Sequence, residues 1–209
     1  MARYTESSCK KCRRYGSKLF LKGDRCMGEK CAFQKRPNIP GQHGPTSRRG
    51  KLTDYGSHLI EKQKARFHYG IMESQFGRYY VEASRQRKIP TGDRLLQLLE
   101  LRLDNVVYRL GLASSRPFAR QMVLHRKVKV NNRYVNIPSF RVKPGDVVTF
   151  KDEFLSNVYV KSSLEKGEVV PTWLSLNLAD KKAEILSLPT KEEIKTPFNE
   201  QLIVEFYSK

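Results

Sequence analysis

Apolar residues in the middle of the chain recur at the spacing of a single helix face. They lie three and four residues apart between positions 96 and 110, which predicts one helix that buries a stripe. These positions are Leu96, Leu99, Leu103, Val106 and Leu110. Gly111 is expected to end the helix, because the residue after a last turn often adopts a positive φ.

A second helix and a hairpin are expected to follow. Ser114 or Ser115 can cap that helix, and Pro117 suits its first turn, where a missing N–H costs little. Valine and lysine alternate over residues 127–130, which predicts a strand with one charged and one apolar face. Residues 131–133 (NNR) predict the hairpin turn, since asparagine tolerates left-handed φ.

Two helices are also expected before this module. Residues 53–70 predict the first, capped by Thr53 or Asp54, and residues 74–88 predict the second. The tyrosines of the second helix could stack on bases, but their helical spacing favours packing in a core. Residues 90–92 (PTG) break this helix, so a domain boundary is expected near residue 92.

Short apolar runs in the last third of the chain predict strands that complete a sheet. They lie at residues 147–150, 158–160, 173–176 and 185–188. The turn before the first run is expected at residues 144–146 (PGD). The final segment, residues 199–207, fits a strand through Ile203 and Val204 or a helix capped by Asn199, and its pattern leaves both open.

The formal net charge of +19 is unevenly distributed. Residues 1–50 hold 13 basic and 3 acidic side chains, whereas residues 151–209 hold 8 basic and 10 acidic ones. This asymmetry predicts a phosphate-rich partner. Nucleic acid is favoured over an anionic membrane, because no apolar run approaches the ~18 residues of a spanning helix. The first residues lack the apolar segment of a signal peptide, so we expect a cytosolic protein.

All four cysteines lie near the N-terminus, in two pairs with short spacings. They are Cys9, Cys12, Cys26 and Cys31. Two such pairs can offer four thiolates to one tetrahedral ion, and disulfides do not persist in a reducing compartment. We therefore expect a structural four-cysteine zinc knuckle that replaces the core this segment lacks, with an iron–sulfur cluster as the alternative.

The stretch after the cysteines, residues 36–51, is basic and rich in proline and glycine. It is either a plain linker or an arm that becomes ordered along an RNA backbone. His43 lies in this stretch without an evident partner, so no catalytic role is expected for it. Neither a phosphate-cradling glycine loop nor a nucleophile elbow occurs, so the chain is expected to be a binding protein and not an enzyme.

Several motifs resemble the family of bacterial small-subunit ribosomal protein S-four (S4). Residues 99–123 resemble the signature of its small RNA-binding domain, the αL motif, which pseudouridine synthases and tyrosyl-tRNA synthetases also carry. The likeness covers the whole chain, with further motifs at residues 40–44 (PGQHG), 102–111 (RLDNVVYRLG), 173–176 (WLSL) and 199–208 (NEQLIVEFYS). The chain is therefore identified as a member of this family in its cysteine-bearing form.

The resemblance implies an α+β fold with three parts. Residues 1–42 would form the four-cysteine metal knuckle and basic arm, and residues 43–92 a helical domain that residues 197–209 rejoin. Residues 93–196 would form the RNA-binding domain, helices packed on a small, mostly antiparallel sheet, with a core module at residues 99–161. This architecture favours the helical interpretation of the C-terminal segment.

The resemblance also implies functional residues. The four cysteines would be the metal ligands. The charge of the N-terminal segment already indicates Arg13, Arg14, Arg36, Arg48 and Arg49 as RNA contacts. The resemblance adds the RNA-facing cations Arg102, Arg109, Arg116, Arg120, Arg126, Lys127, Lys129 and Arg133. Among them, Arg102 lies between buried leucine positions and could instead pair internally with an acidic neighbour.

The implied function is primary binding of small-subunit (16S-type) ribosomal RNA, which nucleates assembly of the body of the 30S subunit. Family members affect translational accuracy, lie beside the proteins S-five and S-twelve near the side where messenger RNA enters, and in some cases repress translation of their own operon. Two alternatives use the same domain: an RNA-modifying enzyme and a zinc-knuckle nucleic-acid-binding regulator. Neither a membrane partner nor a homo-oligomer is expected.

Overall fold

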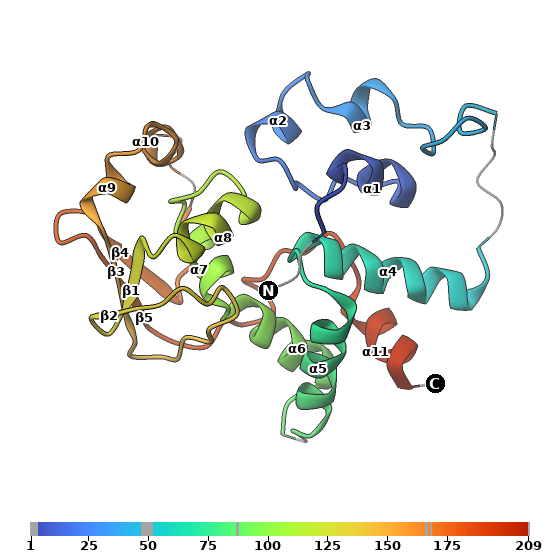
Figure 1. Ribbon diagram of the computed structural model, residues 1–209. Coiled ribbons are helices and arrows are strands. Elements are labelled where there is room, and N and C mark those ends of the chain that lie inside the picture. Colours follow the sequence, from blue (N-terminus) through green and yellow to red (C-terminus); the bar gives the residue numbers. More distant parts are fainter. Residues whose placement is uncertain (1–3, 47–51, 87, 166, 168, 209) are drawn as a thin grey trace. The chain divides into compact units, whose positions relative to one another are not determined.

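The computed structural model describes residues 4–46, 52–86, 88–165, 167 and 169–208 of an α+β chain (Figure 1). The chain divides into two compact units. Unit 1 comprises Met1–Leu95 and Thr196–Lys209, and unit 2 comprises Leu96–Lys195. The finer division of the first 92 residues into a knuckle and a helical domain stays a prediction.

Unit 1 is helical in the part that the structure describes. Its elements are α1 (Ser8–Tyr15), α2 (Asp24–Met27), α3 (Ala32–Lys35), α4 (Asp54–His68), α5 (Glu73–Ser84), the start of α6 (Thr91–Glu100) and α11 (Glu200–Ser208). The side chain of Thr53 accepts a hydrogen bond from the N–H of Gly56 at 3.2 Å, which confirms the predicted cap of α4. Helix α5 begins one residue before the predicted Ser74.

The C-terminal segment is helix α11, which packs along α4 (Figure 1). The helical interpretation is thus confirmed, and the side chain of Asn199 accepts a hydrogen bond from the N–H of Gln201 at 2.9 Å. Ile203 is fully buried. Tyr79 is buried in the core, and half-buried Tyr80 stacks on Tyr207 with centroids 4.6 Å apart, so the tyrosines of α5 make packing contacts as their spacing favoured.

The N-terminal segment of unit 1 has a small apolar core, contrary to the prediction that metal replaces one. Buried Leu19 and Cys12 cluster with Phe67 at the end of α4. The ring of Tyr15 stacks on Phe67 at a centroid distance of 6.0 Å, and Tyr4 meets it edge-on at 5.1 Å. The ring of Phe67 at the end of α4 therefore helps to anchor this segment.

Unit 2 contains a five-stranded antiparallel sheet in its described residues, in the order β2-β1-β3-β5-β4. The strands are β1 (Val128–Val130), β2 (Arg133–Tyr134), β3 (Val147–Phe150), β4 (Leu174–Asn177) and β5 (Lys182–Ile185). The helices are the end of α6, α7 (Leu103–Arg109), α8 (Arg116–Leu124), α9 (Asp152–Leu155) and α10 (Val158–Glu165).

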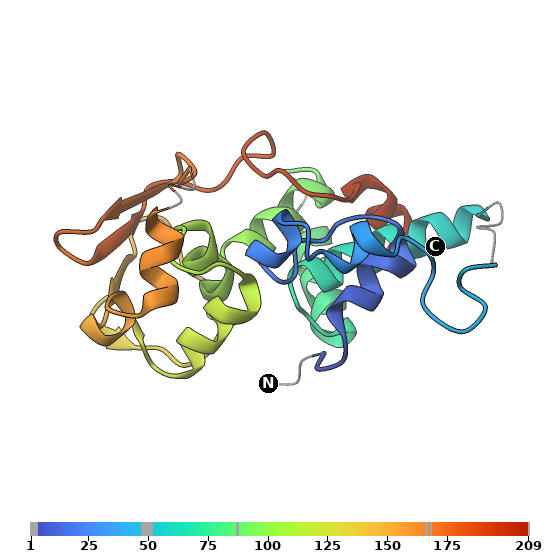
Figure 2. The same ribbon diagram turned by 90° about the horizontal axis from the view of Figure 1, so that it is seen from above.

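One face of this sheet forms the core of unit 2. Inward residues of β1, β3 and β5 join α7, α8 and Trp173 in one buried cluster, and the helices of the unit lie on one side of the sheet (Figure 2). The hairpin turn is confirmed, since Asn131 and Asn132 have φ of 47° and 64°. Gly111, with φ of 72°, follows α7 as predicted.

Two predictions about unit 2 are wrong, and a third is displaced, since the strand expected at residues 185–188 is β5 (Lys182–Ile185) and overlaps the predicted run only at Ile185. The stripe between positions 96 and 110 spans two helices, because the chain leaves α6 after Glu100 and pairs with another segment. Arg102 is extended and bridges Arg141, while the N–H of Leu103 donates to the carbonyl of Phe140 at 2.8 Å. This tertiary pairing overrides the helical period.

The second wrong prediction is the strand at residues 158–160, which instead form the start of α10. The side chain of Asn157 accepts a hydrogen bond from the N–H of Tyr159 at 2.9 Å and so caps this helix. Val160 is fully buried against the core. Local capping and burial thus outweigh the β-propensity of the two valines.

A carboxylate of α5 connects α4, α5 and α11 in unit 1. Glu73 accepts hydrogen bonds at 2.8 Å from both Lys62 and Tyr207. Burial would raise the pKa of Glu73, but these hydrogen bonds and the charges of Lys62 and Arg66 lower it below 4.5. A carboxyl whose pKa is lowered by folding stabilises the fold above its unfolded pKa.

We expect Glu73→Gln to lower the free energy of unfolding by about 1–3 kcal/mol at pH 7, because nearly buried Lys62 loses its charged partner. The difference from the wild type should shrink as the pH falls from the unfolded pKa through the lowered pKa of the folded carboxyl, because the wild-type carboxyl becomes protonated over that range. A series of urea unfolding curves from pH 7 into the acid range measures both effects, with exposed Glu192→Gln as the control. A pH-independent difference would contradict this account.

Candidate nucleic-acid interface

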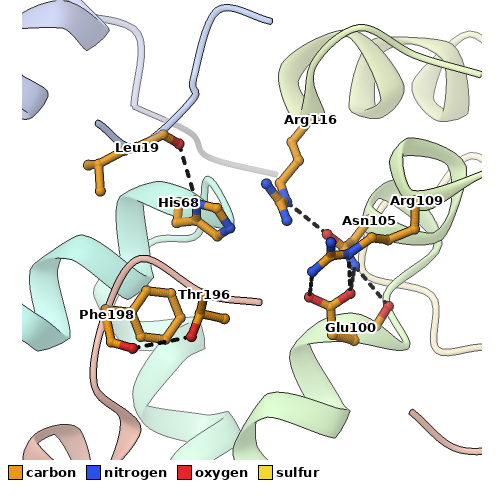
Figure 3. Close-up of polar contacts among 8 residues, drawn as sticks. All are labelled: Leu19, His68, Glu100, Asn105, Arg109, Arg116, Thr196 and Phe198. Carbon is orange, nitrogen blue, oxygen red and sulfur yellow. Dashed lines mark hydrogen bonds and ion pairs between the residues drawn. The ribbon is translucent and has the colours of Figure 1, made fainter. Parts of the chain in front are cut away.

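A chain of polar contacts in unit 2 connects the end of α6 with α7 and α8 (Figure 3). The guanidinium of Arg109 donates to both carboxylate oxygens of Glu100, at 2.8 and 2.7 Å. The amide nitrogen of Asn105 also donates to Glu100, at 2.7 Å, and its oxygen accepts from Nε of Arg116 at 2.7 Å. Arg116 lies over the ring of Tyr108 at 4.4 Å. Each contact holds the next one in place.

A second buried cluster centres on Asp104. Arg102, only 1% exposed, donates to its two carboxylate oxygens at 3.0 and 2.7 Å. Arg120, which comes from α8, lies 3.4 Å from the same carboxylate. One acid thus joins two guanidinium groups from different elements, and this ties α8 to the start of α7.

Four arginines predicted to face RNA are therefore engaged inside unit 2. Arg102, Arg116 and Arg120 are buried, and Arg109 is mostly covered. Their positions indicate that they hold α7 and α8 in place. The acidic residues at positions 100 and 104 were the sequence signal for this role.

The predicted cations of the hairpin lie nearer the surface. Arg126, which follows α8 with a φ of 56°, and Arg133 in β2 are exposed. Lys127 is partly covered and hydrogen-bonded to Glu153, and this contact lowers the pKa of that carboxyl. Arg126 and Arg133 are thus the better placed of these cations to contact phosphates.

The solvent face of the sheet carries a cluster in which Lys129 was predicted from the sequence but Tyr134 and Lys151 were missed. Tyr134 is 54% exposed, and the ammonium groups of Lys129 and Lys151 lie 4.6 and 4.8 Å from the centre of its ring. Lys129 pairs in register with Tyr134 and with Thr149, so all belong to the same face. We call Lys129, Tyr134 and Lys151 the sheet-face cluster. The sequence signal for Tyr134 and Lys151 was the alternation of side chains between the two faces of a strand, which also places Lys129 on this face.

In unit 1 the structure brings Arg13 and Arg36 to one hollow of about 950 Å³. Five of its lining side chains are basic and two are acidic: Arg13, Arg25, Lys30, Lys35 and Arg36, with Asp24 and Glu29. The guanidinium of Arg13 donates to the carbonyl of Asn38 at 2.9 Å. Arg14 is exposed on α1, whereas Arg48 and Arg49 lie outside the described residues.

The four cysteines are free thiols, three of them buried. Burial raises the pKa of the Cys12 thiol, and the thiols of Cys26, Cys9 and Cys31 raise it further. The N–H of Lys22 donates to Sγ of Cys26 at 3.3 Å. This donor set suits a thiolate-bound metal chemically. However, no three His, Cys, Asp or Glu side chains in the described residues are arranged to hold an ion.

Comparison with known proteins confirms the resemblance seen in the motifs. Residues 3–100 match the family described as "Ribosomal protein S4/S9 N-terminal domain", and residues 101–148 match "S4 domain". The chain is 56% identical to small ribosomal subunit protein uS4 of Dictyoglomus thermophilum, and the match of 209 residues covers 100% of both chains. Identity is 52% to uS4 of a Thermoanaerobacter species and 50% to uS4 of Clostridium tetani, with the same coverage.

Among the helices of the described residues, none combines the length and apolar character needed to cross a bilayer.

We expect the buried and exposed arginines to differ in their effect on stability. Arg102→Met should lower the free energy of unfolding by about 3–5 kcal/mol, because it leaves Asp104 buried with one poorly placed partner. Arg133→Gln, at the exposed position, is the matched control and should change it by less than about 0.5 kcal/mol. Denaturant unfolding measures both, and equal effects would contradict the structural role of Arg102.

Proposed function

Since the chain belongs to the uS4 family of small ribosomal subunit proteins, we propose that it binds small-subunit ribosomal RNA as a structural constituent of the cytoplasmic ribosome. The observation that carries this proposal is the sequence identity of 56% and 52% to proteins named uS4, over the whole length of both chains. Proteins of this family are not enzymes, so binding is the whole of its chemistry.

The division between buried and exposed cations supports a specific version of RNA binding. The buried arginines at positions 102, 116 and 120 fix α7 and α8, while exposed Arg126 and Arg133 and the sheet-face cluster contact phosphates. In unit 1, Arg13, Arg14 and Arg36 contribute with the predicted Arg48 and Arg49. Contacts to phosphates fix the position of the protein and read the shape of folded RNA.

The role in assembly follows from this mode of binding. A protein that neutralises phosphates from several helices holds an RNA junction together, and in this way it nucleates the body of the 30S subunit. Effects on translational accuracy, proximity to S-five, S-twelve and entering messenger RNA, and repression of its own operon are further parts of the proposal. They rest on the resemblance to the family.

A structural zinc ion held by the four cysteines is also part of the proposal. Four thiolates close the coordination sphere, so the ion would hold the two cysteine pairs together and leave no position for catalysis. The buried sulfurs and the N–H directed at Cys26 support it. An iron–sulfur cluster uses the same ligands.

The salt dependence of RNA affinity tests the proposed phosphate contacts. Lys129→Gln and Arg133→Gln should each reduce the slope of log K against log[salt] by about 0.7–0.9 on small-subunit rRNA, because each removes one phosphate contact. Exposed Lys161→Gln on α10 is the control and should leave the slope unchanged. Wild-type affinity for duplex DNA should be much weaker. Equal affinity for both nucleic acids would favour the DNA-binding regulator.

Metal content tests the zinc proposal. Native mass spectrometry should find one zinc ion per chain, and Cys12→Ser should lose it, because three thiolates bind zinc more weakly than four. Ser7→Ala, beside the first cysteine pair, should retain it. A chelator should lower the melting temperature of the wild type, since metal binding contributes to folding. A folded, metal-free wild type would refute the site.

A further inference from the structure

Gly77 lies in the interior of helix α5 and points away from the core. The buried face of α5 consists of Phe76, Tyr79 and Ala83, whereas Gly77 is half-exposed. Glycine inside a helix destabilises the helix relative to alanine, because it loses more conformational freedom on folding. The loss of helix stability at this position therefore has to be explained by something other than the helix itself.

The described part of the chain supplies no reason for Gly77. A Cβ at Gly44 would lie 1.8 Å from the carbonyl oxygen of Ile39, so glycine is required there, and one at Gly92 would lie 3.0 Å from the side chain of Glu200, a tight contact. Gly77 has neither a positive φ nor a described neighbour within 4 Å of an added Cβ. Inside unit 1, as described, alanine would fit at this position.

A hollow of about 600 Å³ lies along the outer face of α5, and Gly77 forms part of its lining. It is lined by Ser74, Gly77, Arg78, Val81, Glu82 and Arg85. Arg78 and Arg85 are exposed and lie two helical turns apart, about 10 Å along the axis. Positive charge outweighs the one acidic side chain of the lining, and an added Cβ at Gly77 would meet no described atom within 4 Å.

We propose that the outer face of α5 is an RNA-docking surface on which a sugar–phosphate backbone approaches the helix at Gly77. Arg78 and Arg85, which both follow Gly77 and lie at similar angles around the helix, contact phosphates of that backbone, and the absence of a Cβ permits the close approach. The contacts that the RNA backbone makes at Gly77 thereby offset, in the complex, the helix stability that the glycine costs the free protein. This inference rests on the proposed binding of ribosomal RNA, but none of the residues predicted to face RNA belongs to this surface.

Gly77→Ala tests the inference, because it should move stability and affinity in opposite directions. We expect the melting temperature of the free protein to rise by about 1–4 °C and the affinity for small-subunit rRNA to fall by about fivefold to tenfold. Ser84→Ala, at the end of the same helix and outside the hollow, is the matched control. It should leave the affinity unchanged.

A second variant keeps the test independent of helix stability. Arg78→Gln should lower the slope of log K against log[salt] by about 0.7–0.9. Unchanged RNA affinity in Gly77→Ala together with an unchanged slope in Arg78→Gln would overturn the inference. The inference would be overturned even if these variants were incorporated less well into the small subunit, because lower incorporation with unchanged RNA binding would assign the surface to a protein partner. Failure of the wild type to bind rRNA would instead refute the proposed function.

Discussion

A buried guanidinium group must find hydrogen-bond acceptors beside it, and this constraint shapes how the helices of unit 2 pack. Glu100 and Asp104 are almost completely buried, and each receives a bidentate arginine. Desolvation of such groups costs several kcal/mol, so the contacts must be made completely. Asn105 meets this demand by donating to Glu100 and accepting from Arg116. These contacts therefore hold α7 and α8 in their observed arrangement.

The same constraint decides which cations remain for RNA. A residue on the inward side of α7 or α8 must find an internal partner, whereas a strand alternates its side chains between core and solvent. Val128 and Val130 are buried in β1, and Lys129 between them points to the solvent face. Around the ring of Tyr134 this alternation gathers two ammonium groups that face water. Basic side chains thus have two roles: the buried ones hold helices together, and the exposed ones remain available to contact RNA.

Sequence reasoning succeeded where the signal was local. The caps at Thr53 and Asn199 and the turn at Asn131 follow from side chains that satisfy or bend the nearby backbone. It failed where the cause was distant. The break after Glu100 depends on pairing with residues 140–142, which no local pattern reveals. Likewise, the internal partners of the arginines lie up to 16 positions away, as for Arg120 and Asp104.

Helix α4 explains how the N-terminal segment of unit 1 can be ordered by more than a metal ion. Its C-terminal end presents Phe67 to the rings of Tyr4 and Tyr15, and Nδ1 of His68 lies 3.3 Å from the carbonyl oxygen of Leu19 (Figure 3). These contacts fix where the segment lies, whereas a four-cysteine metal site would fix the shape of the two cysteine loops. Since Lys62 of the same helix pairs with Glu73, which also accepts a hydrogen bond from the C-terminal helix, the two ends of the chain depend on one helix for their placement.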